Sequence, residues 1–330
     1  DLQQFLTPLI DTIIEKQKYQ KILPIQNKIS ENLQKDIAEH IMKIIGFDFK
    51  RGRLDKSVHP FCGGSTNDVR ITTRYNEDNP FSSLDGVMHE TGHALYELNL
   101  PEKWNYQPVG KARGMAMHES QSLMIEMQIT RSQAFKKFLS KLLKNKFNIF
   151  DNAFESENLY LLGTRVEKSF IRVESDEATY NLHIMIRYEV EKLLISGELE
   201  IDDLPDAWDD MYERYLGIRS PDRKQGVLQD IHWSMGAFGY FPTYTLGNLY
   251  SAQLLQAARN DLESDGHTLE DDWRRGIFTP LLDWMRTNVH HRGSILTPAD
   301  LIEEATGNTP IPEPFVDYLK DKIGTIYGLA

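Results

Sequence analysis

The chain has 330 residues, of which 40% are hydrophobic and 26% are charged, so it can bury a large core in one domain or two. Its net charge of −12 argues against binding to nucleic acid or anionic membranes, which use basic surfaces. The chain has one cysteine, so an internal disulfide is excluded. It has no apolar run of membrane-spanning length and no signal segment, and we therefore expect a cytoplasmic protein.

The first fifty residues predict two amphipathic helices. Apolar residues recur at helical spacing in residues 1–20, before Pro24, and again in residues 29–45, before Gly46. The chain opens on Asp1 without an initiator methionine and already inside a helical pattern. We therefore expect an upstream segment of a longer protein to precede it.

Residues 46–80 contain several glycines and prolines and break the helical pattern. Residues 68–75 are β-branched and alternating, which predicts a strand, and residues 76–80 predict a turn. The strand has two open interpretations. It could offer an edge to which an extended substrate adds, or it could form a plain hairpin beside the next helix.

The helix predicted next contains the pattern His-Glu-x-x-His. His89 and His93 are four residues apart, so a helix places both on one face, where they could bind one zinc-sized ion. Glu90 adjoins the first histidine and is suited to act as general base on a metal-activated water. Gly92 is a weak helix former, which indicates close packing at that position. An ordinary amphipathic helix with two histidines is the alternative interpretation.

A catalytic zinc site usually has three protein ligands and an open position for water. A loop over residues 101–114 leads to a second predicted helix over residues 117–127, which carries two candidate third ligands. Glu119 has polar neighbours that suit a hydrated site, so it ranks first. Glu126 lies among apolar residues and ranks second.

The remaining helices follow from apolar spacing and breaker residues. They are a basic helix over 131–148, at least two helices within 151–200 (one of them 178–195), an acidic helix over 202–215, and helices over 248–262, 269–288, 299–305 and 314–326. His290 and His291 are expected at the surface. We expect one mainly helical domain over residues 1–330.

Residues 221–247 are polar, aromatic and rich in glycine, which is typical of a loop that lines a cleft. This segment contains His232, Tyr240 and Tyr244. Each of these side chains could donate a hydrogen bond to an oxyanion.

Six short motifs occur in a fixed order and cover most of the chain. They are His59-Pro60-Phe61, Asp68-Val69-Arg70-Ile71-Thr72, His89-Glu90-Thr91-Gly92-His93, His118-Glu119-Ser120-Gln121, Ile171-Arg172-Val173-Glu174-Ser175-Asp176, and Gly226-Val227-Leu228-Gln229-Asp230-Ile231-His232-Trp233. In these motifs the chain resembles the M32 family of metallocarboxypeptidases, the thermostable carboxypeptidase Taq family. Ser175 departs from the family pattern, which usually has alanine there.

The resemblance implies a large helical metallopeptidase fold with a deep groove and, with the predicted strand, a small β-sheet near the active site. It implies removal of single residues from the C-termini of short peptides. His89, His93 and Glu119 carry over as ligands of one divalent metal, and Glu90 as the base. Zinc is the expected metal, with cobalt and manganese as alternatives, and a homodimer is expected. Family members also carry a further N-terminal helical segment, so we expect this chain to be a fragment of a longer protein.

In the chemistry expected of such a site, Glu90 accepts the proton of the attacking water and passes it to the leaving amine. An exopeptidase also needs a cation for the terminal carboxylate, and the forked guanidinium of arginine suits it. Arg172 is the first candidate, Arg70 the second, and His59 a further substrate-binding candidate. A structural salt bridge is an equal alternative for each arginine, with Asp68 and Asp176 as orienting partners.

Two other functions remain open. The same metal site could serve a helical endopeptidase or aminopeptidase, which would cut a peptide blocked at its C-terminus. The chain could also be an inactive metal-binding scaffold, although Glu90 argues against this because a structural metal site needs no base.

Overall fold

The computed structural model describes residues 2–58 and 60–329, which form two compact units. The first unit comprises residues 1–21, 164–246 and 316–330, and the second comprises residues 22–163 and 247–315. The expectation of a single catalytic domain stays a prediction.

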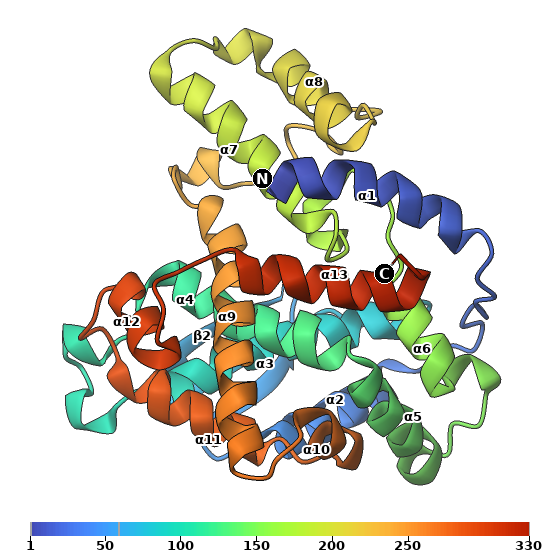
Figure 1. The fold of residues 1–330 in the computed structure, drawn as a ribbon, viewed down its shortest axis with the longest axis vertical. Coiled ribbons are helices and arrows are strands. Elements are labelled where there is room, and N and C mark those ends of the chain that lie inside the picture. The colour runs from blue at the N-terminus through green and yellow to red at the C-terminus, as the bar shows by residue number, and fades with distance from the viewer. Residues whose placement is uncertain (1, 59, 330) are drawn as a thin grey trace. The chain divides into compact units, whose positions relative to one another are not determined.

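The described residues are mainly helical, with one small sheet (Figure 1), so the predicted fold class is confirmed. The α-helices are α1 (Leu2–Gln17), α2 (Glu31–Ile45), α3 (Pro80–Leu98), α4 (Gly114–Leu123), α5 (Gln133–Phe147), α6 (Ser156–Gly163), α7 (Tyr180–Ser196), α8 (Leu204–Leu216), α9 (Pro242–Ser264), α10 (Leu269–Arg275), α11 (Thr279–Asn288), α12 (Pro298–Thr306) and α13 (Glu313–Tyr327). A π-helical segment, Met124–Thr130, follows α4 directly. The strands are β1 (Gly52–Lys56), β2 (Phe61–Ser65) and β3 (Asp68–Thr73).

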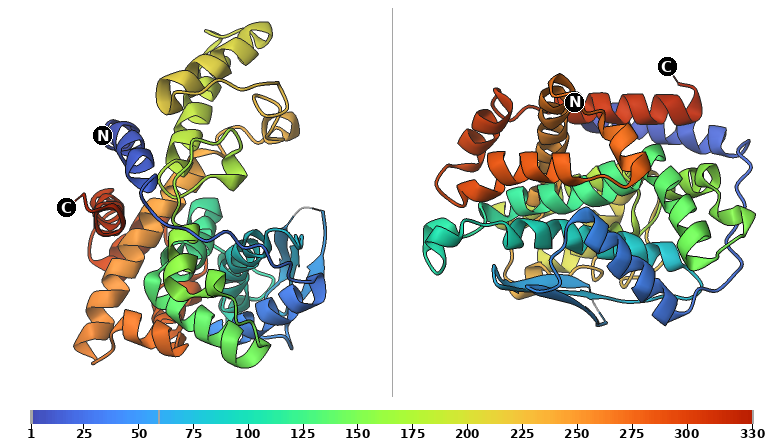
Figure 2. Two further views of the ribbon diagram at one scale, coloured as in Figure 1. Left: turned by 90° about the vertical axis from the view of Figure 1, so that its right-hand side faces the viewer. Right: turned by 90° about the horizontal axis from the view of Figure 1, so that it is seen from below.

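The sheet has the order β1-β3-β2, with β3 parallel to β1 and antiparallel to β2. The sequence pattern predicted β3 but neither of its neighbours. Because β3 is paired on both sides, it offers no edge to an extended substrate, so that interpretation of residues 68–75 is wrong. The sheet packs beside α3 through β2 and β3 (Figure 2).

Glycines in the left-handed region end several helices where the sequence predicted an end. Gly46 has φ 109° after α2, and Gly197 has φ 76° after α7. Gly276, with φ 76°, also ends α10, and a new helix begins at Thr279. The single helix predicted over residues 269–288 is therefore wrong, because the left-handed glycine ends a helix inside this range.

Each unit has its own buried apolar residues. In the second unit, Val87, Met88 and Leu95 of α3 belong to a continuous core that also includes residues of α2, α5, α9 and α11. In the first unit, Leu6, Ile10 and Ile13 of α1 are buried, and Lys16 Nζ near the end of α1 donates to the carbonyl oxygens of Tyr327 and Gly328 at the end of α13. No helix in the described part of the chain is long and apolar enough to cross a membrane.

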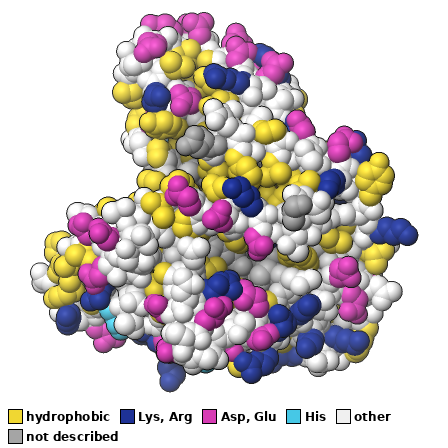
Figure 3. All heavy atoms as spheres, viewed as in Figure 1, with side chains coloured by type: hydrophobic (Ala, Val, Ile, Leu, Met, Phe, Trp, Pro, Cys, Tyr) yellow, Lys and Arg dark blue, Asp and Glu magenta, His cyan; other side chains and the backbone are white. Residues whose placement is uncertain are grey.

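Acidic side chains gather on the segment that joins α7 to α8 and on α8 itself (Figure 3). Between Glu198 and Glu213 the sequence contains acidic residues and no lysine or arginine. This segment therefore carries a large share of the net negative charge.

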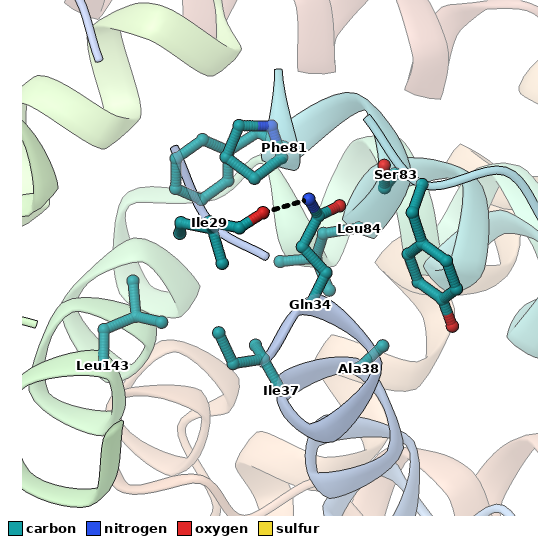
Figure 4. Close-up of a pocket in the computed structure, with 10 residues that line it drawn as sticks. Ile29, Gln34, Ile37, Ala38, Phe81, Ser83, Leu84 and Leu143 are labelled. Carbon is teal, nitrogen blue, oxygen red and sulfur yellow. Dashed lines mark hydrogen bonds between the residues drawn. The ribbon is translucent and has the colours of Figure 1, made fainter. Parts of the chain in front are cut away.

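A small cavity in the second unit lies among α2, α5 and the first turns of α3 (Figure 4). Its volume is about 20 Å³, which is room for about one water. Gln34 Nε2 donates to the carbonyl oxygen of Ile29 at 2.7 Å beside it. This volume is too small for a peptide, and none of the described candidate site residues lines the cavity.

Candidate metal centre

Helix α3 carries the His-Glu-x-x-His pattern, as predicted. Asn79 caps its start by accepting a hydrogen bond from the Ser82 backbone, and Pro80 occupies the first turn, where no N–H is needed. The regular helix then places His89 and His93 one turn apart on one face. Their ring centroids lie 4.9 Å apart.

The third side chain of the cluster comes from α4, which lies unusually close to α3. A Cβ built on Gly92 would lie 2.4 Å from the backbone oxygen of Gln121 and 2.6 Å from Cα of Ser122. Only glycine permits this approach. The expectation that Gly92 serves close packing is confirmed.

Glu119 of α4 reaches both histidines. Its Oε2 lies 3.4 Å from Nε2 of His93, and its Oε1 lies 3.9 Å from Nε2 of His89. One ligand atom from each residue falls within 4.8 Å of the others. Donors around a tetrahedral zinc, at about 2.0–2.1 Å from the ion, lie about 3.3 Å apart. These three side chains therefore fit a divalent metal.

Glu126 does not belong to this three-residue cluster. One oxygen, Oε2, accepts a hydrogen bond from Nδ1 of His89 at 2.9 Å, and Oε1 accepts one from Nη2 of Arg131 at 2.6 Å. Both oxygens are thus engaged away from the three ligand atoms. Glu119, the first-ranked candidate, is the carboxylate that the structure brings to the two histidines.

His93 is held differently. Its Nδ1 lies 3.0 Å from the backbone oxygen of His118 and 2.6 Å from Nδ1 of that residue. The other ring nitrogen of His118 lies 2.9 Å from Oε1 of Glu97. The Nδ1 atoms of both α3 histidines therefore have partners, and both Nε2 atoms are directed to Glu119.

The two histidines have opposite pKa shifts. Burial disfavours the charged form of His89, but the carboxylates of Glu119 and Glu126 outweigh burial and raise its pKa to about 10. Burial lowers the pKa of His93 to about 4. Burial also raises the pKa of Glu90, whose side chain is buried beside His89. A carboxyl with a raised pKa is better matched to proton transfer near neutral pH.

The first unit contains a separate buried cluster of charges around Asp230. Oδ1 accepts hydrogen bonds from Nε and Nη2 of Arg172, and Oδ2 accepts one from Nε of Arg187 at 2.6 Å. The guanidinium of Arg172 also lies over the ring of Tyr244, 4.7 Å from its centroid. The side chains of Arg172 and Arg187 are 7% and 0% exposed, so both are committed to this cluster.

Three predicted oxyanion donors also lie together in the first unit. Nε2 of His232 is 3.1 Å from the hydroxyl of Tyr244, and the rings of His232 and Tyr240 have centroids 5.3 Å apart. Burial lowers the pKa of His232, which favours a neutral ring.

Four other predictions have different outcomes. Arg70 pairs with Asp68 as expected, but both side chains are more than half exposed. Asp176 is not the partner of Arg172, because its oxygens accept from the backbone of Glu167, Ala178 and Thr179. His59 lies outside the described residues. His290, expected at the surface, is buried, with Nε2 2.9 Å from Oε1 of Gln121.

Sequence reasoning missed the buried polar face of α7. His183, Arg187 and Glu191 are spaced at four residues, and each is buried on this helix, whose other buried side chains are mostly apolar. The side chain of Glu191 accepts hydrogen bonds from Nε1 of Trp233 and from the backbone of Gly239. Together with Arg187, it holds residues 229–239 to the helix. Charged residues at helical spacing within an apolar helix were the available signal.

Comparison with known proteins identifies the family of the chain. The family model for carboxypeptidase Taq (M32) metallopeptidases matches residues 1–323. Thermostable carboxypeptidase 1 of Thermus thermophilus is 41% identical over 99% of this chain, and carboxypeptidase 1 of Bacillus subtilis is 37% identical over 99%. The chain spans 64% and 65% of the length of these relatives.

Solved structures give the same result. Metallocarboxypeptidase 1 of Trypanosoma cruzi superimposes with a TM-score of 0.93 at 41% identity, covering 97% of this chain and 66% of that one. The match of the family model over nearly the whole chain, together with these relatives, shows that this protein belongs to the carboxypeptidase Taq (M32) metallopeptidase family.

Proposed function

We propose that this chain carries the catalytic centre of a metal-dependent carboxypeptidase, which removes single residues from the C-termini of short peptides. The observation that carries the proposal is the convergence of His89, His93 and Glu119, with Glu90 beside them on α3. The family and the names of the relatives support the same activity.

A divalent metal held by His89, His93 and Glu119 would supply a Lewis acid for the scissile carbonyl and would acidify the attacking water. Glu90 accepts the proton from that water and delivers it to the leaving amine. The raised pKa of Glu90 suits both steps, because a carboxyl group with a pKa closer to neutral can accept a proton and then release it. The buried setting of Glu90 limits competing water.

We further propose that Arg172, or failing it Arg70, binds the terminal carboxylate of the substrate, with His59 as a further contact. His232, Tyr240 and Tyr244 are the proposed donors to the developing oxyanion. Because Arg172 is buried against Asp230, a purely structural salt bridge remains the alternative for it. Zinc as the metal, with cobalt or manganese as substitutes, a homodimer and a cytoplasmic location also stay predictions.

The test is a mass-spectrometric time course on one short peptide, supplied with a free and with an amidated C-terminus. The protein is assayed with added Zn²⁺ or Co²⁺ and with a chelator. Stepwise loss of C-terminal residues from the free peptide alone, abolished by the chelator, is expected. Internal cuts, or cuts in the amidated peptide, would instead indicate an endopeptidase or aminopeptidase. Absence of any cleavage with metal present would contradict a catalytic role for this chain alone and leave the metal-binding scaffold.

A further inference from the structure

We propose that Glu126 is a positioning residue that sets the metal affinity of the site through His89, and that Arg131 keeps it in this role. The inference rests on the metal site proposed above, but it concerns metal binding and not peptide cleavage. Glu126 would contact neither the metal nor the substrate.

The contact between Glu126 and His89 determines which ring nitrogen can bind a metal. An ionised carboxylate can only accept hydrogen bonds, so at 2.9 Å from Oε2 the Nδ1 atom of His89 must carry the proton. In the neutral form of the ring, which is the form that can bind a metal, the lone pair is then on Nε2. That atom faces Oε1 of Glu119, on the side where the three ligand atoms converge. Glu126 therefore selects the tautomer and fixes the orientation of the first ligand.

Arg131 explains why the Glu126 carboxylate is not directed to the point where the three ligand atoms converge. Nη2 of Arg131 lies 2.6 Å from Oε1 of Glu126 and 3.7 Å from Oδ2 of Asp85. The side chains of Glu126 and Arg131 are only 13% and 12% exposed, so water screens this pair weakly. The guanidinium thus holds one carboxylate oxygen and leaves the other for His89.

The backbone around Glu126 is adapted to this arrangement. Residues Met124–Thr130 form a π-helix, a conformation that is rare and frequent at functional sites. Thr130 Oγ1 donates to the backbone oxygen of Glu126 at 2.6 Å within the widened turn. Arg131, at the end of the segment, then lies within reach of the Glu126 side chain.

Among the residues that the structure describes, Nδ1 of the second histidine has no carboxylate partner. Nδ1 of His93 faces the backbone oxygen and the ring of His118, and Glu97 contacts only the far nitrogen of that ring. Removing the Glu97 carboxylate leaves the backbone oxygen in place. Glu97→Gln is therefore a matched control, because it alters a carboxylate near the other histidine without removing the hydrogen-bond acceptor of a ligand.

The experiment measures Zn²⁺ affinity by competition with a chromogenic chelator for the parent chain and the variants Glu126→Ala, Glu126→Gln and Glu97→Gln. Outer partners of metal-binding histidines typically contribute about 10–100-fold in affinity. We expect Glu126→Ala to lose affinity in that range. Glu126→Gln should recover part of it, because its amide oxygen can still accept from His89. Glu97→Gln should change affinity by less than about threefold.

A double-mutant cycle tests the role of Arg131. If Arg131 acts through Glu126, then Arg131→Gln weakens Zn²⁺ binding in the parent chain and has little further effect in the Glu126→Ala background. The Co²⁺-loaded variants give an independent readout, since altered geometry at His89 changes the visible absorption spectrum of bound Co²⁺. Thermal melting of the metal-free variants, matched to the parent, establishes that a change in affinity is not loss of the fold.

The outcomes separate this inference from the proposed function. Parent-like Zn²⁺ affinity and a parent-like Co²⁺ spectrum in Glu126→Ala would overturn the role of Glu126, even if the chain cleaves peptides. Equal losses of Zn²⁺ affinity in Glu126→Ala and Glu97→Gln would also overturn it, because the proposal requires the carboxylate beside His89 to matter more than the one near His93. Tight Zn²⁺ binding that depends on Glu126, without peptide cleavage, would contradict the proposed function and support this inference.

Discussion

Gly92 of α3 lies directly against the backbone of Gln121 on α4, so closely that a methyl group on Gly92 would sit 2.4 Å from the Gln121 oxygen. Glu119 lies two residues before Gln121 on the same helix. The absence of one side chain thus allows the helix that carries Glu119 to approach the helix that carries both histidines.

Replacement of Gly92 by alanine is therefore expected to destabilise the protein. The new methyl group meets backbone atoms, which cannot move aside as a flexible side chain can, and such overpacking costs about 1–3 kcal/mol. Alanine is a better helix former than glycine by up to about 1 kcal/mol, and this gain is smaller than a packing cost in the upper part of that range. Chemical denaturation should show a lower free energy of unfolding. Gly86→Ala on the same helix is the control, because its methyl group meets nothing within 4 Å. It should be neutral or stabilising, and equal effects at both positions would contradict the packing argument.

Replacement of Glu90 by glutamine should separate metal binding from catalysis. The amide keeps the size of the side chain but cannot accept a proton, so we expect the turnover number to fall by about 10²–10⁴-fold. Zn²⁺ affinity should stay near that of the parent, because Glu90 is not one of the three converging side chains. Steady-state kinetics and chelator competition measure the two quantities. Unchanged turnover would rule out Glu90 as the base and spare the fold.

Replacement of Asp230 by asparagine should destabilise the first unit. It leaves Arg172 and Arg187 buried without their shared carboxylate, and breaking a buried pair in this way costs about 3–5 kcal/mol. Asp68→Asn, which removes the exposed partner of Arg70, is the control and should change stability little. If the free energy of unfolding fell by a similar amount in both variants, the buried cluster around Asp230 would not have the importance argued for it.

The contribution of Asp230 to the stability of the protein should also depend on pH. Burial tends to raise the pKa of Asp230, but the guanidinium groups of Arg187 and Arg172 outweigh it, so the pKa in the folded state is lowered. Its stabilising contribution is therefore complete above the unfolded pKa of about 4 and is lost as the pH falls through the lower folded pKa. The stability difference between the parent chain and Asp230→Asn should narrow below about pH 4. A difference that widens there would contradict the assignment.

Gly247 of α9 offers a test of how rigidly Glu119 is held. A Cβ at this position would lie 2.8 Å from Cγ and 2.9 Å from Cβ of Glu119. Gly247→Ala should displace that carboxylate and weaken Zn²⁺ binding by about tenfold or more, because metal sites tolerate little displacement of a ligand. Chelator competition gives the affinity, with Gly86→Ala again as the control. Unchanged affinity would mean that α9 can move away.

The local pattern predicted the elements that depend on short-range chemistry. The spacing of His89 and His93 required only a helix, and the apolar period and capping signals of residues 80–98 supplied it. Gly46 and Gly197 ended their helices as predicted because a left-handed residue terminates a helix regardless of its surroundings. Gly276 has the same conformation and was missed inside an otherwise helical pattern.

The local sequence pattern could not predict contacts between residues that are far apart in the chain. Strand β2 is short, contains two glycines and has a mostly exposed face, so it lacks the alternation that predicted β3. Its pairing with β3 is visible only when both are placed in space. Likewise, Arg172 and Asp230 are far apart in sequence, so proximity along the chain favoured Asp176, which instead accepts backbone hydrogen bonds nearby.

By itself, the sequence determined the helical class, the family resemblance and the three side chains suited to a metal, because residue type, short spacing and motif order carry that information. Only the tertiary structure decided where the Glu126 carboxylate is directed. Glu126 lies two helical turns after Glu119, so helical spacing alone allows either side chain to be the third ligand. Its hydrogen bonds to His89 and Arg131 arise from a π-helical turn and from helix packing at Gly92, and neither can be read from local spacing.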